Sequence, residues 1–380
     1  MRRGQADVVV VGGGIIGCAV ARELALRGLS VMVLERDSPG RRATWAAAGM
    51  LSPLGETVDD GPFLALAEDS LRRYASYVHG LHEASGIDVE YRTNGKLHVA
   101  LDGDDAAIRA LAAHPAAPRF DVRVLDGDGA RALEPSLPDR VTAGVLVGRD
   151  HRINNRLLAQ ALLASAMAAG VGFRTASPVA TIAARHRSAT GVRLASGEAI
   201  DAGHVVLAAG AWCSHIEGLP GAVPVRPVKG QMFAVDGRGR GPDRTEVGPP
   251  TRVVQSARCY IIPRDDGRIL VGATVEDVGF RKGATPAGLT GLMTAAMELV
   301  PAIADLPVVE TWAGFRPATP DYLPIIGADP DLKGLVYATG HYRNGILLAP
   351  VTAAAAADIV TQGQAGALAA AFGIERLRGG

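Results

Sequence analysis

The first 35 residues place the strongest constraint on the fold. In "DVVVVGGGIIGCAVARELALRGLSVMVLER", the β-branched run Val8–Val11 suits a buried parallel strand. A helical apolar pattern follows, and the segment 31–34 then predicts a second strand that ends at Glu35. Between the first strand and the helix, three glycines stand at G-x-G-x-x-G spacing: Gly12, Gly14 and Gly17. This order of strand, glycine turn, helix, strand and acid predicts a Rossmann-like α/β unit that binds a dinucleotide.

The glycines and Glu35 of this unit each have a physical role in binding a dinucleotide. Gly12 permits the tight turn, Gly14 lets a pyrophosphate approach the backbone, and Gly17 lets the helix lie close to the strand. The helix N-terminus offers free N–H groups and a positive dipole end to the phosphates. Glu35 can accept hydrogen bonds from ribose hydroxyls. A glycine turn in an unrelated α/β protein is the alternative, and the motif alone does not separate NAD from FAD.

Composition limits the remaining possibilities. A chain of 380 residues with 48% hydrophobic residues predicts two domains or one large α/β domain. Basic and acidic residues balance at 39 each, so bulk charge does not indicate a nucleic acid or an anionic membrane as partner. Three scattered cysteines indicate neither a disulfide framework nor a metal site, and we expect a cytoplasmic protein with no metal. We also expect no transmembrane segment, because the Ala-rich "VTAAAAADIV" is short and carries Asp358.

Several later segments carry a family resemblance. "GRRATWAAAGML" (residues 40–51) and "GHYRNGILLAP" (340–350) resemble signatures of the glycine oxidase branch of the D-amino-acid oxidase family. "CYIIPR" (259–264) and "TWAGFRPATPDYLPIIG" (311–327) match that branch in order and spacing. "VVLAAGAW" (205–212) is similar to a turn found across these flavoproteins. The resemblance covers nearly the whole chain.

The resemblance implies an FAD-dependent amine oxidase of α/β class, α+β overall. Its Rossmann-like FAD-binding domain would be interleaved with a substrate domain built on a large mixed or antiparallel sheet. The FAD-binding domain would comprise residues 1–85, 145–220 and 317–380. The substrate domain would comprise residues 86–144 and 221–316.

The resemblance also implies where non-covalent FAD is held. Family members with covalent flavin attach it through a C-terminal cysteine, and no cysteine follows Cys259 here. In "YATGHYRNGILLAP" (337–350) we expect a strand, a glycine turn and a helix whose N-terminus faces the electron-rich end of the flavin. Free backbone N–H groups from residues 341 to 347 would stabilise the reduced flavin there; an ordinary exposed helix cap is the alternative. The residues expected to contact FAD are Gly12, Gly14, Ile15, Ile16, Gly17, Glu35, Arg36, Ala43, Thr44, Ala48, Gly49, Met50, Val179, Gly340, His341, Tyr342, Arg343, Asn344, Gly345, Ile346 and Leu347.

Three residues are implied to act on an amino-acid substrate. Arg316 would bind the carboxylate, since a planar guanidinium matches two oxygens; a structural ion pair with Asp321 is the alternative. Tyr260 would offer its hydroxyl to the same carboxylate, or could simply pack its ring in the core. Arg343 would lie at the active site.

Two positions depart from the family pattern near the expected substrate pocket. Val275 stands where a methionine is found, and Arg258 stands where a histidine is found. A shorter side chain at Val275 could leave room for a substrate larger than glycine. Arg258 could bind a second acidic group or form an ion pair away from the site. Glycine, sarcosine and small D-amino acids therefore all remain candidate substrates.

The resemblance predicts oxidative deamination by hydride transfer from the α-carbon to flavin N5, with O2 as the final acceptor and H2O2 as the product. An imine formed from glycine could feed thiazole synthesis for thiamine. Two alternatives stay open: a dehydrogenase that passes electrons to a quinone or protein, and a flavin-binding subunit without activity. A homo-oligomer is also compatible with the family.

Overall fold

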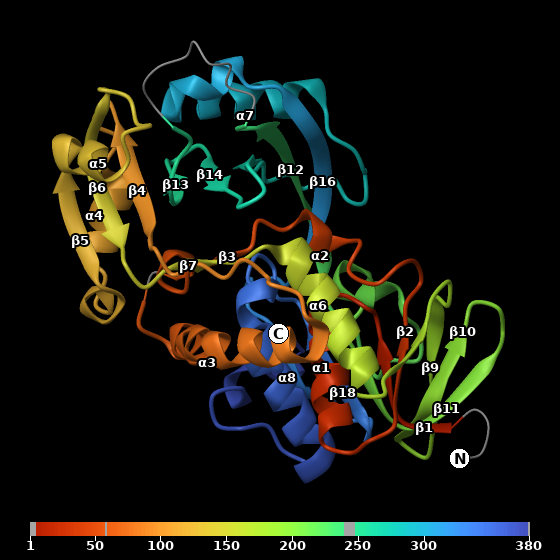
Figure 1. The fold of residues 1–380 in the computed structure, drawn as a ribbon. Coiled ribbons are helices and arrows are strands. Elements are labelled where there is room, and N and C mark those ends of the chain that lie inside the picture. The colour runs from red at the N-terminus through yellow and green to blue at the C-terminus, as the bar shows by residue number, and fades with distance from the viewer. Residues whose placement is uncertain (1–4, 58, 239–247, 379–380) are drawn as a thin grey trace.

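The computed structural model describes residues 5–57, 59–238 and 248–378. It contains two eight-stranded sheets, each with its own helices (Figure 1). The small remaining parts of the predicted domain segments, residues 1–4, 58, 239–247 and 379–380, lie outside the described residues.

The first sheet has the order β17-β18-β11-β1-β2-β8, with β10 beside β11 and β9 beside β10. The strands β18, β11, β1, β2 and β8 run parallel, as the β-branched run at Val8–Val11 predicted. The strands are β1 (Gln5–Val11), β2 (Val31–Leu34), β8 (Gly172–Arg174), β9 (Val179–Arg185), β10 (Ser188–Leu194), β11 (Ala199–Leu207), β17 (Ile325–Ala328) and β18 (Leu335–Thr339).

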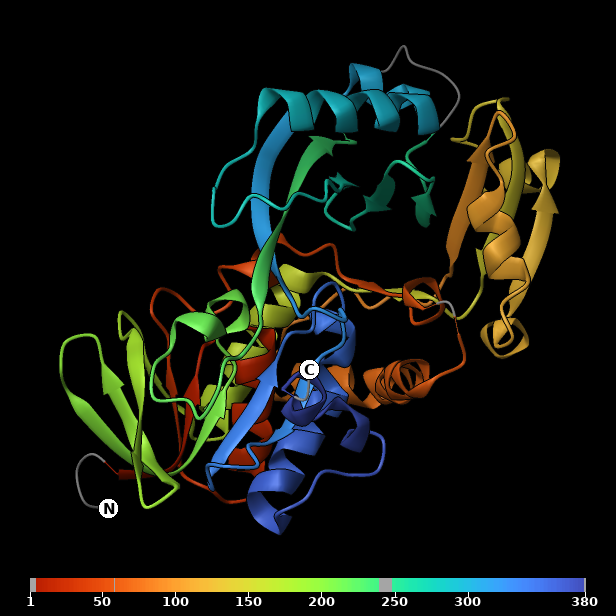
Figure 2. The same ribbon diagram turned by 180° about the vertical axis from the view of Figure 1, so that it is seen from behind.

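Four helices cover one face of this sheet and form its largest core. They are α1 (Ile15–Leu26), α3 (Pro62–Ser85), α6 (Asn155–Ala168) and α8 (Gly345–Gln362). By length and composition, α8 is apolar enough to cross a membrane, but 67% of it is buried inside the fold. It packs against α1 and α3, so its apolar surface is accounted for by the core (Figure 2).

The second sheet has the order β16-β12-β15-β14-β13-β4-β6-β5 and is antiparallel except where β13 meets β4. The long helix α7 (Pro286–Leu299) packs on β12 and β15 and closes a separate core. The strands are β4 (Lys96–Leu101), β5 (Val122–Asp126), β6 (Val141–Val147), β12 (Arg226–Asp236), β13 (Val253–Gln255), β14 (Tyr260–Pro263), β15 (Arg268–Gly272) and β16 (Val308–Ala318).

The short elements complete the chain. Two small helices, α4 (Ala106–Ala112) and α5 (Gly127–Leu133), pack on β5 and β6. The one-turn helix α2 (Ala43–Ala46) and the small pair β3 (Met50–Leu51) and β7 (His151–Arg152) lie between the two sheets. Since both sheets draw strands from separate parts of the sequence, the interleaved α/β architecture is confirmed. The exact domain boundaries stay a prediction.

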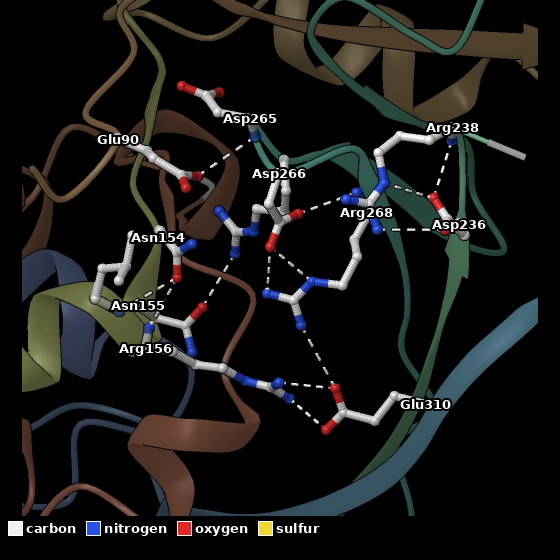
Figure 3. A network of polar contacts seen from close by, with 12 residues as sticks. Glu90, Asn154, Asn155, Arg156, Asp236, Arg238, Asp265, Asp266, Arg268 and Glu310 are labelled. Atoms are coloured by element: carbon white, nitrogen blue, oxygen red, sulfur yellow. Dashed lines mark hydrogen bonds and ion pairs between the residues drawn. The ribbon is translucent and has the colours of Figure 1, made fainter.

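A polar network joins the two units (Figure 3). Arg156 of α6 forms two 2.7 Å hydrogen bonds to the carboxylate of Glu310 on β16. Nearby, the buried Arg264 donates to the carbonyl oxygens of Ala48 (2.7 Å) and Ile153 (2.8 Å) and to Asn155 Oδ1 (3.0 Å). Burial lowers the pKa of Arg264 to about 10, so its guanidinium remains charged at neutral pH. One side chain of the second unit thus fixes three points of the first.

Replacing Arg264 with methionine should strongly destabilise the protein. Three buried acceptors would lose a charged donor, and we expect a cost of at least about 3 kcal/mol. Thermal unfolding of the holoprotein measures this as a lower midpoint. Arg238→Gln, which removes only an exposed pair with Asp236, is the control and should leave the midpoint unchanged. Equal midpoints for the two variants would refute this role of Arg264.

Candidate functional site

A cavity of about 250 Å³ opens between the two units. The first unit contributes the N-terminal ends of α1 and α8 and the segment from α2 to Glu56. The second unit contributes side chains from β12, β13, β14, β16 and β4. The cavity therefore lies at the carboxyl ends of β1 and β18, where ligands bind in open α/β sheets.

The glycine turn forms the first wall of this cavity. Gly14 is the N-cap of α1 and has no side chain to cap the helix. A Cβ placed on Gly14 would meet nothing nearer than Thr44 Oγ1 at 3.6 Å, so the space beside it is open to a ligand. Thr44 accepts a hydrogen bond from Ile15 N (2.9 Å), and Glu35 accepts one from Gly13 N (2.7 Å).

The other two glycines of the motif serve the fold itself. Gly12 has a φ of 105°, and a Cβ there would lie 2.6 Å from Ala208 O. A Cβ on Gly17 would lie 1.9 Å from Gly12 O, so only glycine lets α1 approach the strand. Gly12 and Gly17 are absent from the cavity lining.

The second wall is the N-terminus of α8, which follows β18 as the sequence predicted. Its N-cap Asn344 makes no side-chain cap. Tyr342 N donates to Pro317 O (2.9 Å) and Asn344 N donates to His341 O (2.8 Å). Two N–H groups between residues 341 and 347, those of Tyr342 and Asn344, are therefore already bonded within the protein. His341 and Asn344 are buried while Arg343 is exposed, so the turn is not the fully exposed helix cap of the alternative.

His341 is a structural residue in this turn. Its Nε2 lies 2.9 Å from Thr352 Oγ1, and its side chain is buried. Burial lowers the pKa of His341 to about 3, so the ring is neutral at physiological pH. It therefore adds no charge to the cavity.

The residues present fit FAD. The helices α1 and α8 pack side by side and both present their N-termini to one cavity. Neither N-cap residue supplies a side-chain cap, although Ile15 N at the start of α1 donates to Thr44 Oγ1. Such ends favour negative charge, which FAD carries on its pyrophosphate and, when reduced, on its flavin ring. The expected FAD contacts that line the cavity are Gly14, Ile15, Ile16, Ala43, Thr44, Ala48, Gly49, Met50, Gly340, His341, Tyr342, Arg343, Asn344, Gly345 and Ile346.

The remaining expected contacts lie outside this lining. Glu35 follows β2 and is held by the glycine turn. Arg36 stacks over the ring of Trp212 at 3.9 Å. Val179 begins β9 and pairs with Leu194, while Leu347 is buried within α8. Contacts between FAD and these four residues, and those expected at Gly12 and Gly17, stay predictions.

Arg316 is a half-buried cation that lines the cavity. Its Nη1 donates to Thr274 O (3.0 Å) and Lys229 O (3.2 Å). Among the described residues no carboxylate pairs with it, and Asp321 instead pairs with Arg376 at 2.8 Å. The structural pair of Arg316 with Asp321 is thus ruled out, and its charge is available to a ligand.

Tyr260 also lines the cavity, at the start of β14. Its hydroxyl lies against Gly272, where a Cβ would come within 2.5 Å of the oxygen. Burial raises the pKa of Tyr260, although Arg316 and Arg343 oppose the rise. The hydroxyl is therefore protonated at neutral pH and can donate a hydrogen bond.

Arg343 lies at the boundary of the cavity with a second, adjoining hollow. Its Nε lies 3.1 Å from Glu56 Oε2, and 47% of its side chain is exposed. The charge of Arg343 is therefore already compensated, in contrast to that of Arg316.

The two departures from the family pattern have different positions. Val275 lines the cavity and is 61% exposed, which places it at the rim. Arg258 is absent from the lining and pairs with Glu298 of α7. The expectation that Arg258 belongs to the substrate pocket is therefore wrong, because a carboxylate outside the pocket holds it.

Several side chains that line the cavity were not predicted from the sequence. Lys96 of β4, Gln255 of β13 and Met232 of β12 all face the cavity, as does Glu56. The signal for Lys96 was present in "NGKLHVAL", where a lysine begins an otherwise largely apolar strand. The positions of the other three follow only from how the sheet folds over the first unit.

Comparison with known proteins identifies the family. The family model described as FAD dependent oxidoreductase matches residues 7–359. The glycine oxidase of Pseudomonas aeruginosa is 36% identical, with 93% of this chain and 94% of that protein covered. The crystal structure of glycine oxidase from Geobacillus kaustophilus superimposes with a TM-score of 0.87 at 32% identity, covering 97% of this chain and 98% of that one.

A second kind of relative is longer. The bifunctional protein ThiO/ThiG of Nostoc sp. is 38% identical over 97% of this chain, but only 55% of that protein is covered. The chain thus spans about half the length of these relatives. The matched family model and these relatives agree with the glycine turn and the two helix N-termini at the cavity. The chain therefore belongs to the FAD-dependent oxidoreductases, and its cofactor is non-covalently bound FAD.

Proposed function

We propose that this chain is an amino-acid oxidase that acts on a small α-amino acid. The observation that carries the proposal is Arg316, a cation without a carboxylate partner in the described chain, inside a cavity that fits FAD. The names of the relatives, glycine oxidase and ThiO/ThiG, support the same class of reaction.

The side chains of the cavity suit the binding of an amino acid. Arg316 would hold the substrate carboxylate, and the protonated hydroxyl of Tyr260 would donate a hydrogen bond to it. The apolar side chains of Met232 and Val275 would shield the α-carbon from water. These contacts would fix one orientation of the α-hydrogen, and positioning of this kind is a large part of catalysis.

When bound, FAD supplies the acceptor for the hydride that leaves the α-carbon, and O2 then takes both electrons and two protons to become H2O2. The nitrogen lone pair of the deprotonated amine forms the C=N bond, and water hydrolyses the imine. No side chain needs to remove a proton from carbon. In agreement, His341 is neutral and hydrogen-bonded to Thr352.

The first experiment measures peroxide from the purified holoprotein under air with glycine, sarcosine and small D-amino acids. Peroxide in a one-to-one ratio with substrate would establish the oxidase. Flavin that bleaches without peroxide would favour a dehydrogenase that uses a quinone or a protein acceptor. Flavin that none of these amines bleaches would refute the proposal. If glycine is the substrate, its imine would suit thiazole synthesis, as the ThiO/ThiG name suggests.

Replacing Arg316 with methionine should weaken carboxylate binding about a hundredfold, because a buried charge pair costs roughly 3 kcal/mol to truncate. The Kd of acetate, measured by the shift of the flavin spectrum, and kcat/KM should change together. Arg258→Gln is the matched control and should change neither, since Arg258 pairs with Glu298 outside the cavity. A Kd for acetate within twofold of the wild type would contradict this role of Arg316.

Replacing Gly14 with alanine should weaken FAD binding by on the order of tenfold or more, about 1.4 kcal/mol, without unfolding the apoprotein. The added Cβ makes only an ordinary contact with Thr44 Oγ1 (3.6 Å) within the fold, but it would occupy the space where the pyrophosphate is expected. Flavin fluorescence titration and the melting midpoint of the apoprotein separate the two effects. Gly291→Ala on α7, where a Cβ meets nothing, is the control. Equal FAD affinity in both variants would refute the phosphate role of Gly14.

A further inference from the structure

The far end of the cavity carries a cation that the proposed chemistry does not use. The side chain of Lys96 lines the cavity, and the residue is only 4% exposed. No hydrogen bond or ion pair of its ammonium group is found within residues 5–57, 59–238 and 248–378. A buried ammonium has three donors and is costly to leave without partners.

The groups that face Lys96 do not supply a direct partner. Glu56 forms an ion pair with Arg343, with 3.1 Å between Glu56 Oε2 and Arg343 Nε. Asp150 is buried, both of its carboxylate oxygens lack a hydrogen-bond partner, and it is not within ion-pair reach of Lys96. His98 is buried beside Lys96, and burial holds its pKa well below the usual value, so it is neutral.

The charged groups near Lys96 act on its pKa in opposite directions. Burial lowers the pKa of Lys96, while the carboxylates of Asp150 and Glu56 oppose that change and Arg343 adds to it. Burial also raises the pKa of Asp150 to about 6, and Asp150 is therefore mostly ionised at neutral pH and supplies a counter-charge without a direct contact. A ligand carboxylate that reached Lys96 would accept the ammonium hydrogen bonds that no group of the described residues accepts.

The second sheet places Lys96 opposite Arg316. In the order β16-β12-β15-β14-β13-β4, Arg316 belongs to the first strand and Lys96 to the last. Tyr260 on β14 and Gln255 on β13 are register partners and line the cavity on strands between β16 and β4. Lys96 pairs with Val253, two residues before Gln255, so it lies one strand beyond this pair and two residues along it. A ligand held at Arg316 and Tyr260 would reach Lys96 by extending its other end past Gln255 to β4.

We propose that Lys96 binds a second acidic group of the substrate, so that the enzyme prefers an α-amino acid with two carboxylates over one with a single carboxylate. The inference rests on the proposed function, because Arg316 must hold the first carboxylate. The sequence had suggested Arg258 for a second acidic group, but Arg258 is bound to Glu298. Lys96 takes that place within the cavity.

The test uses the holoprotein and simple carboxylates in place of substrate. Acetate, propionate, butyrate and pentanoate are compared with malonate, succinate and glutarate, and the Kd of each is read from the shift of the flavin spectrum. We expect the best dicarboxylate to bind at least tenfold more tightly than the monocarboxylate with the same number of carbons. Lys96→Met should remove this advantage and leave the Kd of acetate within twofold of the wild type.

Controls separate Lys96 from general charge and from folding. Lys282→Met, which removes an exposed lysine, should keep the full dicarboxylate advantage. Lys96→Arg should retain part of the advantage, and each variant is checked by its melting midpoint and FAD content. The comparison of the two acid series in the wild type does not depend on whether any variant folds.

Two results would overturn the inference while leaving the proposed function intact. One is a wild type that binds dicarboxylates no more tightly than monocarboxylates. The other is a folded Lys96→Met variant that keeps the advantage. If no carboxylate of either series shifted the flavin spectrum, the proposed role of Arg316 would fail together with the inference.

Discussion

The structure depends on one buried guanidinium that joins its two units. Arg264 belongs to the second sheet, yet its three acceptors, Ala48 O, Ile153 O and Asn155 Oδ1, all belong to the first unit. Ala48 lies in the segment that lines the cavity. Because a buried charge must keep its acceptors, Arg264 holds this segment and the second sheet in a single relative position. The shape of the cavity between the units follows from that constraint.

Within this frame, two helices supply most of what an anionic cofactor requires. Parallel strands direct the helices that follow them to the same edge of the sheet, so α1 and α8 begin side by side although they are more than 300 residues apart. Their first N–H groups need acceptors, and neither N-cap side chain provides one. A bound FAD would satisfy both ends.

The cations inside the cavity and those at or beyond its edge differ in their partners. Arg343, at the cavity boundary, and Arg258, outside the cavity, are each paired with a glutamate, and their charges are compensated inside the protein. Arg316 and Lys96 line the cavity without a carboxylate partner among the described residues. A protein that neutralises some of its arginines and leaves other cations unpaired in a cavity offers the latter to anionic ligands. Those two positions therefore define the proposed carboxylate sites.

Sequence alone was sufficient for the elements whose signals are local. The glycine spacing, the β-branched strand and the second strand–turn–helix at residues 335–362 predicted the FAD-binding unit, because turns and helix starts depend on a few adjacent residues. The family segments also placed Arg316 and Tyr260 at one site, and both line the cavity. Only the tertiary structure decided which charges are free. Arg258 pairs with Glu298, 40 residues away, while Lys96 forms no ion pair with any carboxylate of the described residues. Such pairs depend on distances between strands that no local pattern encodes.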